Sequence, residues 1–333
     1  MKSIKEYITT MDKKFKCLII YHREDNDGLF SQAILTYYLN NVFDKPNIDY
    51  LGADYVMLST ITKEDIDKWN EMYDNVTLTD ISFNDTKIFA YLIKTLGDKF
   101  TWIDHHAPII KWANDHGYDG INGLRDTHHS ALYNMFKYLY DPINIGEAQM
   151  PELYKILSAY DSFTFKENGY DKDYVMKINK GVEAQTELDR NKTLEIVKNV
   201  MTNDNETISI YDFLETGNII LNNDIRLYKS MCEQCDTDWY VDKDKAAVLF
   251  CEGQSSSIMF NYFINTDIKR GIVFHHKKND SWTMSLYNVN DNDNTFNCGT
   301  YLKENYNGGG HVGAAGCTIT NTKFIKILKN KKI

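Results

Sequence analysis

The sequence predicts an α/β protein with a mainly parallel sheet, flanking helices and a second, smaller α/β domain. Short apolar runs alternate with helical patterns through the first third of the chain, and such alternation is typical of a parallel sheet. A second block of strand patterns begins near residue 237, after a long helical stretch. The length of 333 residues also exceeds what one hydrophobic core usually serves. We therefore expect two domains.

The expected elements follow from the periodicity of apolar residues. In the first domain, strands are predicted at 17–22, 47–53, 75–80 and 99–106, with helices near 29–41, 62–73 and 85–96. Helical periodicity then covers 130–140, 150–160 and 208–235. The last block has expected strands at 238–242, 246–251, 271–276, 281–289 and 316–320, helices near 256–264 and 298–305, and a solvated basic tail at 326–332. The predicted boundaries are 1–205 for a catalytic domain, 206–236 for a helical connector and 237–333 for a substrate-binding domain.

The composition of the chain excludes some classes of function. The net charge of −10 argues against a long basic track for polymeric nucleic acid, because such binding depends on many lysine and arginine contacts to phosphates. No apolar run approaches the roughly 18 residues that a membrane helix requires, so no membrane partner is expected. The amino-terminal residues lack the apolar run of a secretory signal, which predicts a cytoplasmic protein.

The first cluster of polar residues follows the first predicted strand. His22, Asp25 and Asp27 lie on a short turn, and Gly28 permits a tight entry into the next helix. Nitrogen and oxygen donors grouped in this way are typical of a metal site. The alternative is that the carboxylates only cap the helix and interact with its dipole. The turn alone does not decide between the two.

Further donors follow the third and fourth predicted strands. Asp80 ends one apolar run, and the triplet Asp104, His105 and His106 ends the next. Ligands of parallel sheets gather where the strands end, so these residues are expected to meet. Asp161, at the end of an amphipathic helix, could supply a last carboxylate. Singly, Asp80 is more often a helix cap and Asp161 a surface residue.

A glycine-rich segment lies near the carboxyl end. Gly308, Gly309 and Gly310 are followed by His311, between a predicted helix and a predicted strand. Successive glycines let backbone N–H groups approach an anion closely, which favours phosphate binding. The alternative is a flexible loop.

Together these motifs resemble the DHH/DHHA1 phosphoesterases. The shared features are H-x-x-D-x-D-G at 22–28, Asp80, the literal D-H-H at 104–106, Asp161 and G-G-G-H at 308–311. They occur in the family's order and span residues 17 to 320, nearly the whole chain. The family includes RecJ-type exonucleases, nano-RNases and cyclic di-AMP phosphodiesterases.

The resemblance implies a site with two manganese ions. One ion would be held by His22, Asp25 and Asp80, and the other by Asp27, Asp80, His105 and Asp161. Asp104 would orient or electrostatically support His105, and His106 would face the substrate phosphate. Gly308, Gly309, Gly310 and His311 would hold a nucleotide or distal phosphate. Ligand type alone also allows Mg²⁺, Co²⁺ or Zn²⁺.

The chain departs from the family pattern in two places. The H-x-x-D-x-D spacing leaves open which carboxylate serves which ion, with Glu24 as an alternative ligand. Where many members have S-L-R, this chain has Ser285, Leu286 and Tyr287. Tyrosine lacks the donor fork of arginine but offers a face on which a base could stack.

The expected function is hydrolysis of short oligonucleotides or single-stranded nucleic acid from an end. A cyclic dinucleotide phosphodiesterase is the main alternative. A pyrophosphatase or polyphosphatase and a non-catalytic nucleotide-binding protein are further alternatives. Retention of all the expected metal ligands favours an enzyme.

Overall fold

The computed structural model describes residues 15–141, 149–202, 210–251, 257–277, 280–290, 293 and 295–333. The chain divides into two compact units between Ile220 and Leu221. Each unit has its own sheet and its own hydrophobic cores. No helix among these residues is long and apolar enough to cross a membrane.

The first unit contains the expected alternation of strands and helices. Its elements are β1 (Lys16–His22), α2 (Asn26–Val42), β2 (Asn47–Ala53), α3 (Tyr55–Leu58), α4 (Lys63–Met72), β3 (Asn75–Thr79), α5 (Thr86–Leu96), η1 (Gly97–Lys99), β4 (Phe100–Ile103), α6 (Ala107–Asp115), α7 (Ala131–Tyr140), α8 (Glu152–Asp161), α9 (Lys172–Thr186) and α10 (Arg190–Met201). The helix α11 (Ile210–Cys232) contains the division between the units.

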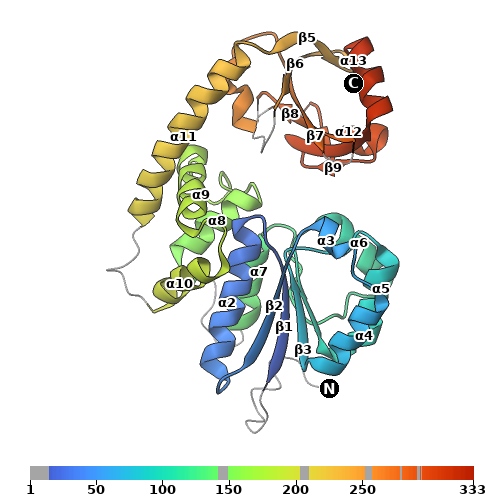
Figure 1. Ribbon diagram of the computed structural model, residues 1–333. Coiled ribbons are helices and arrows are strands. Elements are labelled where there is room, and N and C mark those ends of the chain that lie inside the picture. Colours follow the sequence, from blue (N-terminus) through green and yellow to red (C-terminus); the bar gives the residue numbers. More distant parts are fainter. Residues whose placement is uncertain are drawn as a thin grey trace. The chain divides into compact units, whose positions relative to one another are not determined.

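The four strands of the first unit form a wholly parallel sheet in the order β2-β1-β3-β4. Alternate side chains of β1 point to opposite faces, so Ile19 packs with α2 and α7 while Ile20 packs with α4 and α5. Helices therefore cover both faces of the sheet (Figure 1). This arrangement confirms the predicted fold class, and it brings the carboxyl ends of all four strands to one edge.

The second unit is built on a mixed sheet in the order β5-β6-β7-β8-β10-β9. Its elements are β5 (Asp236–Val241), β6 (Asp244–Phe250), η4 (Ser257–Phe263), β7 (Arg270–Lys277), β8 (Ser281–Asn288), α12 (Cys298–Tyr306), β9 (Gly309–Gly310), β10 (Ala314–Thr320) and α13 (Asn321–Asn330). Among the strands of the described residues, β6 and β7 pair in parallel and the other neighbours pair antiparallel. One face packs on α12 and α13, and the other packs on η4 and the end of α11.

The lysines of the predicted basic tail at 326–332 are exposed, but most of the segment belongs to a helix that was not predicted. Residues 321–330 form α13, which Thr320 caps by accepting the N–H of Lys323 at 3.3 Å. Phe324 and Ile327 are each 5% exposed in the core, because apolar residues three positions apart share one helix face. The lysines of the segment occupy the other faces of this helix.

The predicted domain boundary between 205 and 206 lies outside the described residues. The described part of the predicted connector at 206–236 contains α11 (Ile210–Cys232). The compact units divide within this helix, so it belongs in part to each.

Candidate metal centre

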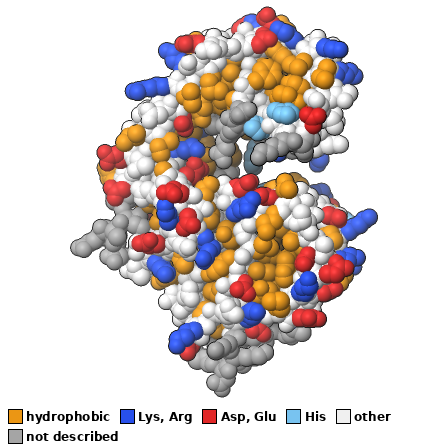
Figure 2. Space-filling model, viewed as in Figure 1, with side chains coloured by type: hydrophobic (Ala, Val, Ile, Leu, Met, Phe, Trp, Pro, Cys, Tyr) orange, Lys and Arg blue, Asp and Glu red, His pale blue; other side chains and the backbone are white. Residues whose placement is uncertain are grey.

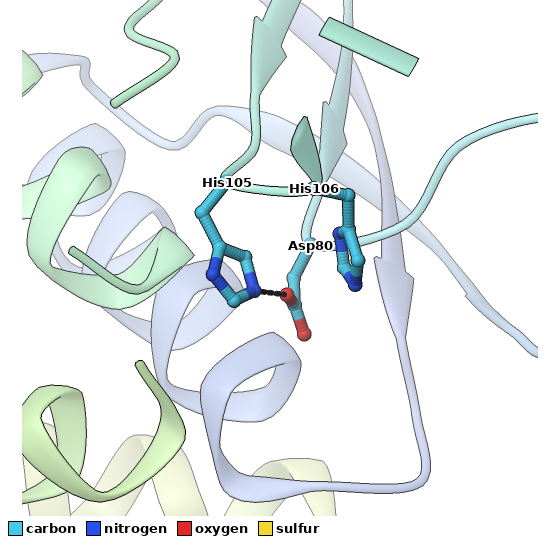
Figure 3. Close-up of side chains that lie close together, drawn as sticks. All are labelled: Asp80, His105 and His106. Atoms are coloured by element: carbon cyan, nitrogen blue, oxygen red, sulfur yellow. Dashed lines mark ion pairs between the residues drawn. The ribbon is translucent and has the colours of Figure 1, made fainter. Parts of the chain in front are cut away.

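The polar clusters expected from the sequence meet at one edge of the first sheet. His22 is the last residue of β1, Asp80 follows β3 and Asp104 follows β4. Asp80 and His105 come from neighbouring loops, and their side chains face each other (Figure 3). Parallel pairing produces this meeting, since it aligns the carboxyl ends of the strands.

Asp80 lies between two histidines. Its Oδ2 atom is 3.6 Å from Nδ1 of His22, and its Oδ1 atom is 3.4 Å from Nε2 of His105. The residue has a φ of 58°, a left-handed conformation that aspartate tolerates better than most residues. Its N–H donates to the carbonyl of Ile103, which ties the loop to β4. One buried carboxylate therefore reaches toward both histidines.

The first donor group consists of His22, Asp25 and Asp80, whose ligand atoms lie within 4.8 Å of one another. Asp25 also caps α2, because Oδ1 accepts the N–H of Gly28 at 3.0 Å while Oδ2 lies 2.7 Å from His22. A Cβ at Gly28 would lie 2.0 Å from the His22 carbonyl oxygen, so only glycine allows α2 to start this close to β1. Asp25 therefore both caps α2 and belongs to the first donor group. Glu24 is more distant, 3.8 Å from the other ring nitrogen of His22.

The second donor group consists of Asp27, His105 and Asp161, again with ligand atoms within 4.8 Å of one another. Nε2 of His105 lies 3.3 Å from Asp161 and 3.8 Å from Asp27. Asp27 is 2% exposed, and its carboxylate accepts the N–H groups of Ala131 and Leu132 at 2.7 and 2.8 Å. The amino terminus of α7 therefore fixes this carboxylate and partly balances its charge.

Asp104 contacts both histidines of the triplet but bonds only one of their rings. Its Oδ1 atom accepts hydrogen bonds from Nδ1 of His106 at 2.7 Å and from the N–H of His105 at 2.8 Å. Its Oδ2 atom accepts the indole N–H of Trp102 at 3.0 Å. This buried carboxylate thus orients the ring of His106. For His105, it accepts only the backbone N–H, and its negative charge acts on the ring from a distance. Asp80, His105 and His106 form a third donor group within 4.8 Å.

Crowding of carboxylates perturbs the acid–base properties of the cluster. Burial and the charges of Asp27 and Asp25 raise the pKa of Asp80 well above its usual range. Burial and the charge of Asp27 raise the pKa of Asp161 to about 7. Burial opposes protonation of His22, but the adjacent Asp25 and Asp80 outweigh it and raise that pKa to about 10. The cluster therefore needs positive charge, in the form of protons or of cations.

Two buried oxygens identify where cations fit. Oδ2 of Asp80 and Oδ2 of Asp161 accept no hydrogen bond from any described residue. A buried unsatisfied polar atom costs about 1–3 kcal/mol. One of these oxygens belongs to each donor group, and a divalent cation would satisfy both. The mixture of imidazole and carboxylate donors suits manganese or zinc better than calcium.

The glycine segment lies in the second unit, between α12 and β10. The N–H of Gly308 donates to Leu302, and that of His311 donates to Ala314 at 2.7 Å, so these two groups serve the fold. Gly310 has a φ of 142°, and a Cβ there would lie 2.6 Å from Ala315. Gly309 is exposed, and a Cβ at this position would meet nothing within 4 Å. Gly309 is therefore the member of the motif with the most open surroundings.

The expectation that Tyr287 offers a stacking face is wrong. The residue is 8% exposed, and its ring packs 5.9 Å from that of Phe260 in the second core of the unit. Tyr287 lies opposite Gly271 on β7, and the ring of Phe260 packs over that glycine, where a Cβ would lie 2.2 Å from it. A base could reach this face only if the core opened.

Sequence analysis overlooked Tyr55. It follows β2, whose carboxyl end lies at the same edge as the donor groups, and its ring centre is 6.0 Å from that of His22. The position directly after a strand of the parallel sheet was a usable signal, but no motif marked it.

Comparisons with known proteins agree with this architecture. No protein-family profile matches the sequence, and no curated protein matches it. Among solved structures, an exopolyphosphatase-related protein from Bacteroides fragilis matches with a TM-score of 0.52 and 15% identity, covering 96% of this chain and 91% of that one. The chain has the RecJ-type DHH/DHHA1 fold. RecJ from Thermus thermophilus, solved with Mn²⁺, matches with a TM-score of 0.51 and 15% identity over 96% of this chain. This chain covers 51% of that RecJ, about half its length.

Proposed function

We propose that this protein with the DHH/DHHA1 fold is a two-metal phosphodiesterase that uses manganese. The observation that carries the proposal is the position of Asp80 between the two donor groups. His22, Asp25 and Asp80 would hold one ion, and Asp27, Asp80, His105 and Asp161 the other. The RecJ structure with Mn²⁺ supports this choice of metal, and Mg²⁺, Co²⁺ and Zn²⁺ remain compatible with the ligands.

When bound, a pair of divalent cations activates a water molecule and neutralises charge on the phosphoryl oxygens. The protein's own groups then have separate tasks. Asp80 sets the spacing of the two donor groups, while α7 prevents Asp27 from turning away. Burial disfavours charge on His106, but its hydrogen bond to Asp104 outweighs burial and raises its pKa. The protonated ring would donate a hydrogen bond from Nε2 to a phosphoryl oxygen. No side-chain nucleophile is required.

The proposed substrates are short oligonucleotides or a single-stranded end. The net charge of −10 weighs against long polymers. On the face shown in Figure 2, basic side chains are scattered among acidic ones and form no continuous band. In the second unit, Gly308, Gly309, Gly310 and His311 are proposed to bind a terminal nucleotide or phosphate, with Gly309 providing the open surface.

Alternative functions remain within the same chemistry. A cyclic dinucleotide phosphodiesterase would use the same donor groups on a ring-shaped substrate. The similarity to an exopolyphosphatase-related protein favours a polyphosphatase or pyrophosphatase as a further candidate. A nucleotide-binding protein without catalysis is disfavoured, because every expected donor is present and gathered in the site.

A substrate panel tests the proposal. Protein loaded with manganese would be incubated with di- to decanucleotides, long single-stranded DNA, cyclic dinucleotides, pyrophosphate and polyphosphate. We expect the highest kcat/KM on short oligonucleotides, with mononucleotides released from one end. A protein with Asp80→Asn serves as the control for contaminating nucleases. Hydrolysis of polyphosphate alone would contradict the phosphodiesterase proposal.

A further inference from the structure

Tyr55 occupies a position beside the first donor group that none of the recognised motifs describes. It begins α3, two residues after the end of β2, and β2 pairs with the strand that ends at His22. The rings of Tyr55 and His22 lie 6.0 Å apart between centres and are tilted by 54°. The side chain of Tyr55 therefore lies at the rim of the metal centre.

Three polar contacts of neighbouring residues fix the start of α3, where Tyr55 lies. The N–H of Arg23 donates to the carbonyl of Ala53 at 3.1 Å, which extends the pairing of β1 and β2 beyond the strands. The guanidinium group of Arg23 forms an ion pair with Asp54. Asp54 in turn caps α3 by accepting the N–H of Met57 at 2.7 Å. The start of α3 is thereby tied to the residue that follows His22.

The hydroxyl group of Tyr55 is free to serve a ligand. It forms no hydrogen bond with any residue that the structure describes, whereas the hydroxyls of Tyr73 and Tyr91 donate to Asp49 and Asp67. Tyr55 is 36% exposed. A tyrosine hydroxyl keeps its proton at neutral pH and can therefore act as a hydrogen-bond donor.

The arginines of the first unit are already engaged, which leaves a task for such a donor. Arg125 donates to four backbone carbonyl groups. Arg190 lies over the ring of Tyr50 at 3.9 Å, and Arg23 is paired with Asp54. A phosphoryl group at the metal centre would have non-bridging oxygens that require donors from the protein. A neutral tyrosine hydroxyl can meet this need without another cation.

We propose that Tyr55 donates a hydrogen bond to a non-bridging oxygen of the phosphoryl group bound at the first donor group, and that the Arg23–Asp54 pair positions it. The inference rests on the proposed phosphodiesterase function. It assigns Tyr55 as a substrate contact and Arg23 as a positioning residue.

Tyr55→Phe tests the contact, because it removes the hydroxyl and keeps the ring. With manganese-loaded protein and bis-p-nitrophenyl phosphate, we expect kcat/KM to fall by about 10- to 100-fold, the range for one hydrogen bond to a charged oxygen. Manganese content and Tm should stay at their wild-type values. Tyr91→Phe is the matched control, since it removes a hydroxyl that bonds Asp67 on α4. A change below about twofold for Tyr55→Phe would overturn the proposal.

A binding measurement separates this inference from the proposed function. The Kd of inorganic phosphate for manganese-loaded protein, measured by calorimetry, should rise about tenfold in Tyr55→Phe. If the wild-type protein binds phosphate but cleaves no phosphodiester, the proposed function fails and the ratio of Kd values still decides the role of Tyr55. An unchanged Kd, or a wild-type protein that binds no phosphate, overturns the contact.

A double-mutant cycle tests the role of Arg23. If Arg23 acts only through Tyr55, Arg23→Gln should weaken phosphate binding in the wild-type background and have little further effect in Tyr55→Phe. Arg23→Lys should restore part of the loss, because it keeps a charge near Asp54. Fully additive effects would show that Arg23 acts independently, and the positioning role would be abandoned.

Discussion

Nδ1 of His106 lies 2.7 Å from Oδ1 of Asp104, and this hydrogen bond leaves Nε2 as the nitrogen that is available to a ligand. The neighbouring ring of His105 has a different environment, with Nε2 within 3.3 to 3.8 Å of three carboxylates. Two consecutive histidines thus have distinct surroundings. One ring is positioned by a buried acid, while the other lies among the acids of both donor groups.

This difference predicts that His105→Ala and His106→Ala separate metal binding from catalysis. His105→Ala should lose manganese, because it removes a donor that lies among Asp27, Asp80 and Asp161. His106→Ala should keep most of its metal and lose at least tenfold in kcat, since it removes the proposed hydrogen-bond donor to the substrate. Elemental analysis of dialysed proteins checks both. Equal metal loss in the two variants would place His106 among the ligands, as the third donor group allows.

Removal of metal should make stability depend on pH. Asp161 has a pKa raised to about 7 from 3.8, so the folded protein holds more protons than the unfolded chain between these values. Stability contributed by protonated Asp161 is therefore lost as pH rises toward 7. The pKa of His22 is raised from 6.5 to about 10, so the stability contributed by protonated His22 is also lost as pH rises above 6.5. The pKa values of Asp25 and Asp104 are lowered from 3.8, so these two groups change the stability only when pH falls below about 3.8.

Bound cations replace these protons, so the difference in Tm between manganese-loaded and EDTA-treated protein should widen from about pH 5.5 to about 7.5. Thermal unfolding followed by circular dichroism measures the difference. Asp161→Asn should flatten the pH dependence of the EDTA-treated protein. A constant difference across this range would argue that the cluster does not exchange protons for metal.

The open surroundings of Gly309 predict an effect on substrate and not on folding. A Cβ at Gly309 meets no atoms within 4 Å, so we expect Gly309→Val to fold, yet its side chain would block close approach of a phosphate or nucleotide. KM for oligonucleotides should rise several-fold, while bis-p-nitrophenyl phosphate should be cleaved almost normally. Gly310→Val is the contrast, because its φ of 142° and its contact with Ala315 should lower Tm. Equal losses on both substrates for Gly309→Val would assign the segment to the fold.

Much of the fold was predictable because its strands are short buried apolar runs. The run ending at His22 and the run ending at Thr79 lie within a residue of their predicted positions. The helix at 321–330 was not predicted, because its many lysines obscured the spacing of Phe324 and Ile327. The pair of glycines that forms β9 carries no strand pattern at all.

The candidate site was predictable as a set of residues but not as a set of contacts. Strand ends gave the positions of Asp80 and His105, since parallel strands share an edge. The contact of Asp27 with Ala131 joins residues 104 positions apart, and no local pattern encodes it. The hydrogen bond of Asp104 to the ring of His106, and not to that of His105, depends on side-chain geometry within a loop. Tyr55 lay at a strand end without a motif to mark it.

The manganese stoichiometry of wild-type protein and of Asp80→Asn tests the account most directly. Asparagine tolerates the left-handed backbone at this position, so the substitution removes the charge that is proposed to bridge the two ions, with little strain. We predict two manganese ions per wild-type chain by calorimetry, and loss of at least one ion with less than about a tenth of the activity in Asp80→Asn. A single ion in the wild-type chain, or two ions and full activity in Asp80→Asn, would contradict a site bridged by this carboxylate.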